Sequence, residues 1–115
     1  MADQDVLLTL CTVPDAETGA NLAELVIQKQ LAACVNVLPG LISIYRWEGK
    51  VEQDPEALMV IKTTRTAFPA LRDAVAEAHP YDVPEIIAAP IDEGLGEYLR
   101  WVRDERLFDE YVYPV

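Results

Sequence analysis

The sequence predicts an α+β domain in which two strand–helix–strand units follow one another along the chain. Two observations support this. The spacing of apolar residues changes from strand to helix and back in each half. The halves also match when one is slid over the other, so that Leu7 falls on Leu58 and Val35 on Ile86. Two such units in tandem form the split βαβ, or ferredoxin-like, arrangement. Because crossovers are right-handed, both helices are expected on one face of a four-stranded antiparallel sheet.

The first unit is predicted from a change of period. An apolar run at 7–13 is too short for a helix and ends before Pro14, which indicates a buried strand. Apolar residues within 15–31 gather on one helical face, and Asp15 is the predicted N-cap of that helix. Residues 32–37 then return to the alternating pattern of a strand.

The segment that follows predicts a long β-hairpin at residues 41–57. The Pro-Gly pair at 39–40 predicts a bulge or bend at its base, and the Glu-Gly-Lys sequence at 48–50 predicts its turn. The Asp-Pro pair at 54–55 is expected to interrupt the returning strand. At about 3.3 Å per residue, the outgoing arm adds about 20 Å of strand beyond the bend.

The second unit repeats the order of the first and is followed by a further helix. The predicted elements are a buried strand at 58–61, a helix that starts near Phe68, a strand at 86–89 and a third helix at 95–107. Thr66 is the predicted cap of the second helix, and His79 before Pro80 is its predicted end. The aromatic tail at 108–115 is expected to dock on the domain.

Composition limits the function classes. The 115 residues have a net charge of −11 and 51% hydrophobic residues, which suits one globular domain at 1–115. Such an acidic chain is not expected to bind nucleic acid or anionic lipid. No apolar run is long enough to span a membrane, and the acidic start lacks the basic region of a secretory signal. The expected location is the cytoplasm.

The hairpin also predicts association. It carries Tyr45 and Trp47 and has apolar residues on both faces. One interpretation is an ordinary hairpin with one face on the core. We favour the other, in which the ribbon pairs with edge strands of neighbouring subunits, because an exposed apolar ribbon with unpaired edges invites association. A closed ring of subunits would satisfy every edge.

Few residues of the sequence are candidates for catalysis or metal binding. Cys11, Cys34 and His79 are the only cysteine and histidine residues, too few for a four-ligand zinc site. Cu(I) accepts fewer, softer ligands, and Cys11 and His79 are expected to meet at one end of the sheet. Buried structural roles remain the default for both cysteines. No nucleophile–base set and no nucleotide loop is present, so neither an enzyme nor an organic cofactor is expected.

Seven segments, in order, closely resemble one family. They are LCTVPD at 10–15, LAACVN at 31–36, LPG at 38–40, YRWEGK at 45–50, IKT at 61–63, HPYDVPE at 79–85 and YLRWV at 98–102. Together they are similar to the divalent-cation tolerance proteins, CutA. The resemblance implies a ferredoxin-like subunit, a homotrimer like the PII signalling proteins, and a role in tolerance to divalent metals, especially copper.

The resemblance also implies site residues. In bacterial members the copper ligands are linked to a cysteine in the first strand and to two adjacent histidines before a proline. Cys11 and His79 occupy matching positions, whereas Ala78 replaces the first histidine of the pair, which leaves two of the ligands.

The expected function is therefore that of a non-enzymatic homotrimer in copper and divalent-metal homeostasis, with Cys11 and His79 as metal ligands. The alternative is a PII-like signalling or scaffold module that binds a small ligand in clefts between subunits. Lys62, Arg65 and Tyr81 are the candidate contacts for that ligand.

Overall fold

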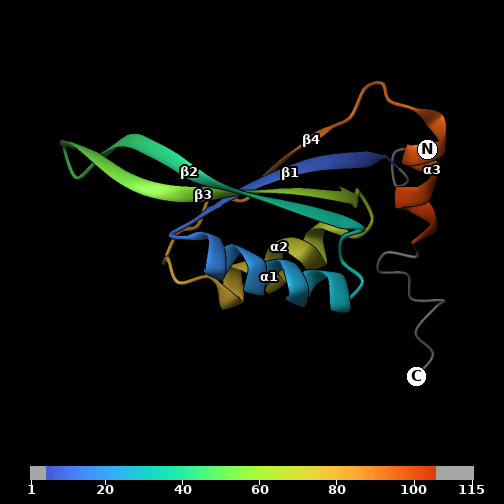
Figure 1. Ribbon diagram of the computed structural model, residues 1–115, viewed down its shortest axis with the longest axis horizontal. Coiled ribbons are helices and arrows are strands. Elements are labelled where there is room, and N and C mark those ends of the chain that lie inside the picture. Colours follow the sequence, from blue (N-terminus) through green and yellow to red (C-terminus); the bar gives the residue numbers. More distant parts are fainter. Residues whose placement is uncertain (1–4, 106–115) are drawn as a thin grey trace.

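The computed structural model describes residues 5–105 and contains the predicted elements in the predicted order (Figure 1). They are β1 (Val6–Val13), α1 (Ala16–Gln28), β2 (Cys34–Trp47), β3 (Lys50–Thr64), α2 (Phe68–Ala78), β4 (Ile87–Pro90) and α3 (Gly96–Asp104). β4 lies one residue later than predicted, and α3 begins one residue later. The predicted docking of the tail at 108–115, and the last residues of the predicted third helix, fall outside the described residues.

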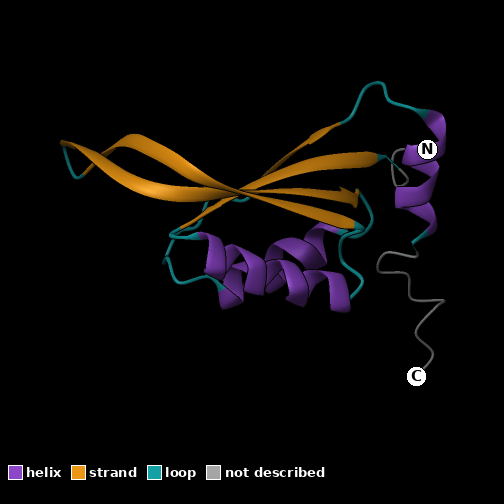
Figure 2. Ribbon diagram, viewed as in Figure 1, coloured by secondary structure: helices purple, strands orange, loops and turns teal. Residues whose placement is uncertain are grey.

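The strands form one antiparallel sheet in the order β2-β3-β1-β4. α1 and α2 lie side by side on one face of it (Figure 2). This order and this layering are those of the split βαβ arrangement. The prediction of a ferredoxin-like fold is confirmed.

The main core lies between the sheet and the two helices. Alternate residues of β1 and β3, among them Cys11 and Met59, point into it. Leu22 of α1 and Leu71 of α2 meet them from the other side. α1 packs closely because Gly19 has no side chain: a Cβ there would lie 3.1 Å from Cγ1 of Val37.

The helix caps agree with prediction at α1 and differ at α2. Asp15 caps α1, since its Oδ1 accepts a hydrogen bond of 2.7 Å from the Thr18 amide, and this bond lowers the pKa of the Asp15 carboxyl. The prediction of Thr66 as the cap of α2 is wrong. Ala67 is the N-cap and makes no side-chain capping bond; its amide instead donates to Oγ1 of Thr64 at 3.2 Å.

The hairpin formed by β2 and β3 extends far beyond the helices, on the left of Figure 1. Its pairing shifts between Leu38 and Leu41, which confirms the bulge predicted at 39–40. The turn predicted at 48–50 is present but one residue shorter: Glu48 and Gly49 form it, with φ of 51° and 82°, and Lys50 already belongs to β3. We call the paired segments 41–47 and 50–56, with this turn, the ribbon.

The predicted interruption of the returning strand at 54–55 is wrong, because β3 runs without a break from Lys50 to Thr64. β1 ends at Val13, which pairs with Ala57, so the ribbon part of β3 has only β2 beside it. A proline is tolerated on such an open edge, since the missing amide proton need not serve a second neighbour.

α3 lies at the end of the sheet opposite the ribbon (Figure 1). Its buried Val102 packs with Val6 and Ala67 in a second small cluster, supported by Leu99. No helix within residues 5–105 is both long and apolar enough to cross a membrane.

Candidate functional site

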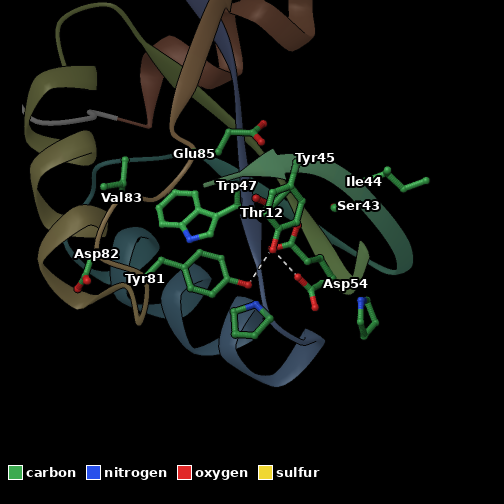
Figure 3. A pocket seen from close by; sticks show the side chains of 13 residues that line it. Thr12, Ser43, Ile44, Tyr45, Trp47, Asp54, Tyr81, Asp82, Val83 and Glu85 are labelled. Atoms are coloured by element: carbon green, nitrogen blue, oxygen red, sulfur yellow. Dashed lines mark hydrogen bonds between the residues drawn. The ribbon is translucent and has the colours of Figure 1, made fainter. Parts of the chain in front are cut away.

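A pocket opens where the ribbon leaves the body of the domain (Figure 3). Three segments line it: the ribbon, the end of β1 at Thr12, and the loop between α2 and β4. The local sequence explains the position of that loop. Pro80 prevents the helix from continuing, and His79, its C-cap, has the extended φ and ψ of −74° and 142°. The chain therefore leaves α2 towards the ribbon.

The two sequence-predicted metal ligands meet at one backbone oxygen. Nε2 of His79 lies 2.9 Å from the carbonyl oxygen of Thr12, and Sγ of Cys11 lies 3.7 Å from the same atom. Both side chains are buried, with Cys11 fully inaccessible and His79 7% exposed. The expected meeting at one end of the sheet is therefore seen, beneath the pocket.

Both ring nitrogens of His79 are engaged. A carbonyl oxygen can only accept, so Nε2 donates to Thr12. A backbone amide can only donate, so Nδ1 accepts from the Tyr81 amide at 3.1 Å. These two bonds select the neutral imidazole with its proton on Nε2. A metal ion would have to displace one of them to reach a nitrogen lone pair.

The thiol of Cys11 is also held in its neutral form. Burial raises its pKa to about 12, and the negative charges of Glu85 and Glu56 add to the rise. Because a metal binds the thiolate, a metal at this site must first drive the proton off.

The pocket itself is lined by two tyrosine–carboxylate pairs. The Tyr81 hydroxyl donates to Oε2 of Glu56 at 2.7 Å, and the Tyr45 hydroxyl donates to Oδ2 of Asp54 (Figure 3). The bond to Asp54 raises the pKa of Tyr45 to about 12. Burial, followed by the bond to Glu56, raises the pKa of Tyr81 above its usual value. Both hydroxyls are therefore donors at neutral pH.

Tyr81 connects the pocket to the buried pair below it. Its ring lies against His79, with ring centroids 4.7 Å apart and planes inclined by 51°. Its amide binds Nδ1 of His79 and its hydroxyl binds Glu56. Tyr81 is therefore in contact both with a carboxylate of the pocket and with the buried His79.

The described residues offer few ligands for a metal. Among them, no group of three or more histidine, cysteine, aspartate or glutamate side chains is arranged to hold a metal ion. Cys11 and His79 supply two donors, and Ala78, at the end of α2, supplies none. The donor chemistry suits copper better than zinc, but the number of donors falls short of a closed site.

The three predicted contacts for a small ligand do not converge within one chain. Lys62 lies on β3 and binds Oδ1 of Asn36. Arg65, just beyond β3, pairs with Asp5 at 3.1 Å, near the start of β1. Tyr81 alone lines the pocket, at the other end of the sheet.

Sequence reasoning missed the carboxylates of the pocket. Asp54 and Glu56 are two positions apart on one strand and therefore share a face. Tyr45, which pairs with Glu52 across the ribbon, lies on that same face. This alternation could have shown from the sequence that the three side chains share a face of the ribbon. The contact with Tyr81 could not be predicted in this way, because Tyr81 lies on a loop distant in sequence.

Comparison with known proteins places this architecture in a family. Residues 7–105 match the family described as "CutA1 divalent ion tolerance protein". A curated relative from Thermus thermophilus, "Divalent-cation tolerance protein CutA", is 52% identical over 97 residues, which cover 84% of this chain and 94% of the relative.

The chain belongs to the CutA1 family. This confirms the resemblance drawn from the seven sequence segments. The human relative, "Protein CutA", is 49% identical over 92 residues, which cover 80% of this chain and 51% of that protein. The chain thus spans about half the length of this CutA relative.

Solved CutA1 structures share the fold. One from Thermus thermophilus has a TM-score of 0.85 at 50% identity and covers 87% of this chain and 97% of its own. One from Oryza sativa has a TM-score of 0.86 at 44% identity, with coverage of 91% and 96%. The agreement extends over nearly the whole of each CutA1 chain.

Proposed function

We propose that this chain is a non-enzymatic homotrimer that contributes to divalent-metal tolerance, with copper as the metal and Cys11 and His79 as its ligands. The family and its relatives are named for divalent ion tolerance, which supports the general role. We assign the protein to the reducing cytoplasm, where its two free cysteines would persist as thiols.

The observation that carries the metal proposal is the shared contact of both side chains with the Thr12 carbonyl oxygen. A thiolate and an imidazole nitrogen are donors that copper accepts. To bind both, the metal must replace the thiol proton and must also gain a lone pair of His79, either by displacing the Tyr81 amide from Nδ1 or after the proton leaves Nε2 for Nδ1, which breaks both hydrogen bonds of the ring. These two costs, together with only two ligands, make the expected binding weak and stronger at higher pH.

The proposal of a trimer is supported by apolar surface that one chain leaves uncovered. α1 and α2 cover one face of the sheet, and the other face carries apolar side chains such as Leu8 and Leu38, which are 36% and 43% exposed. The ribbon adds Ile42 and Val51 at 65% and 69%. Surface of this extent is typical of a subunit contact.

The metal proposal is tested by anaerobic titration with Cu(I) against a competing chelator. We expect Cys11→Ser and His79→Gln each to weaken binding more than about tenfold. Glutamine keeps one donor and one acceptor, so it preserves the fold better than alanine. Cys34→Ser is the matched control, because it removes the other thiol and should leave the affinity unchanged.

If the doubly substituted Cys11→Ser, His79→Gln protein binds Cu(I) as tightly as the unmodified chain, the metal proposal is wrong. Circular dichroism of each variant separates a lost ligand from a lost fold.

A second candidate function is favoured by the pocket itself. Its volume of about 990 Å³ is far larger than a metal ion needs and lies within the range of sites for small organic ligands. This supports the small-ligand part of the PII-like alternative, a module that binds a small molecule and passes the change to a partner, with the pocket formed within one chain rather than between subunits.

A further inference from the structure

We propose that the pocket binds a small organic cation that carries N–H donors, either a guanidinium or an alkylammonium group. The inference rests on the second candidate function and names its class of ligand. It does not depend on metal binding by Cys11 and His79.

The charge of the pocket determines whether it attracts a cation or an anion. Four carboxylate residues line it, namely Asp54, Glu56, Asp82 and Glu85, and no lysine or arginine is among its described lining residues. An anion would meet repulsion from all of them, whereas a cation would be attracted.

Hydrogen bonds from the tyrosine hydroxyls hold two of these carboxylates in a fixed orientation. Each hydroxyl donates to one oxygen, Oε2 of Glu56 or Oδ2 of Asp54, and so fixes the orientation of the group. The second oxygen of each carboxylate remains available to accept a hydrogen bond. Two fixed carboxylate acceptors at one wall suit a cation with several N–H donors, which form charge-assisted bonds.

Aromatic rings supply a second kind of contact. Trp47 and Tyr45 from the ribbon and Tyr81 from the loop all line the pocket and are 56%, 42% and 36% exposed in the single chain. The face of an aromatic ring attracts an organic cation, and a planar guanidinium can also stack on it. An aromatic wall next to carboxylates is therefore better suited to an organic cation than to a hydrated metal ion.

A bare divalent ion fits the same wall poorly. The residues described here hold no cluster of three or more carboxylate, histidine or cysteine ligands, whereas Ca²⁺ and Mg²⁺ bind six or more oxygens. The two tyrosine bonds also use one oxygen of Asp54 and one of Glu56, which reduces what remains for a metal.

Calorimetric titration of the full-length protein with four probes tests the class of ligand. The probes are butylguanidinium, butylammonium, the neutral butylurea, which has nearly the shape of butylguanidinium, and the anion pentanoate. We expect both cations to bind, butylurea to bind at least about tenfold more weakly, and pentanoate to show no binding.

Isosteric variants then locate the site. Asp54→Asn and Glu56→Gln should each weaken butylguanidinium about tenfold and leave butylurea unchanged, because each removes a charge but keeps an acceptor for its tyrosine. Glu93→Gln is the matched control: it removes one exposed charge from the loop before α3 and should change neither affinity.

The outcomes separate this inference from the function on which it rests. If butylurea or pentanoate binds as tightly as the cations or more tightly, the ligand is not a cation and the inference is wrong, but the function as a small-ligand module is still supported. If none of the four probes binds, both fail. An equal loss in Glu93→Gln would show that general charge, and not this pocket, attracts the cations, which also overturns the inference.

Discussion

Cys11 and His79 both contact the carbonyl oxygen of Thr12. The two candidate metal ligands therefore also help to hold the fold together. His79 uses one nitrogen to hold β1 and the other to hold the Tyr81 amide. Cys11 fills the core as a neutral thiol. The sequence identified the pair but could not show that the resting fold occupies its donor atoms, because those contacts come from backbone groups.

The buried thiol predicts a loss of stability at alkaline pH. The folded chain holds the Cys11 proton up to a pKa of about 12, whereas an ordinary thiol loses it near 9.0. Between these values the unfolded chain binds fewer protons than the folded one, so the free energy of unfolding falls as pH rises. The free energy of unfolding lost through the Cys11 thiol should reach about 2 kcal/mol by about pH 10.5.

Urea unfolding at pH 8 to 10.5, in steps of roughly half a unit, measures this loss. Cys11→Ala should remove that part of the alkaline decline, while Cys34→Ala should not. An identical decline in Cys11→Ala and the unmodified chain would mean that other groups cause it.

At the scale of single elements, most of the fold could be predicted from local pattern. The change of apolar period located β1, α1 and α2, and Asp15 marked the start of one helix, because caps and periodicity are local properties. The cap of α2 and the continuity of β3 through Pro55 were missed. The continuity of β3 depends on a strand distant in sequence, because the early end of β1 leaves Pro55 on an open edge. The contact at the start of α2 is local, since Oγ1 of Thr64 accepts a hydrogen bond from the Ala67 amide, and the sequence pattern did not distinguish Thr64 from Thr66.

The turn of the ribbon gives a prediction at this scale. Gly49 has a φ of +82°, which an L side chain adopts at a cost of about 1 kcal/mol or more. Gly49→Ala should therefore destabilise the ribbon locally, with faster hydrogen exchange of the amides at 43–46 and 51–54.

Gly96→Ala is the control for this exchange experiment, since a Cβ there meets no atom within 4 Å and its φ is not positive. Unchanged exchange in Gly49→Ala would show that the turn does not limit the order of the ribbon.

At the scale of the whole molecule, the chain is longer than a compact domain of its size. Its principal extents are 46, 34 and 23 Å, and its radius of gyration is 14.9 Å against about 13 Å for a compact domain of about 100 residues. The ribbon accounts for the length (Figure 1). Sequence reasoning predicted this projection from the length of the hairpin. It could not predict the pocket, whose walls come from three separate segments.

The mass of the protein in solution tests most directly whether sister chains cover the ribbon and the open face of the sheet. Sedimentation equilibrium at micromolar concentration should give three times the chain mass of 12.8 kDa. A mass of 12.8 kDa, unchanged as the concentration rises, would leave the apolar ribbon and sheet face in solvent and would contradict the account.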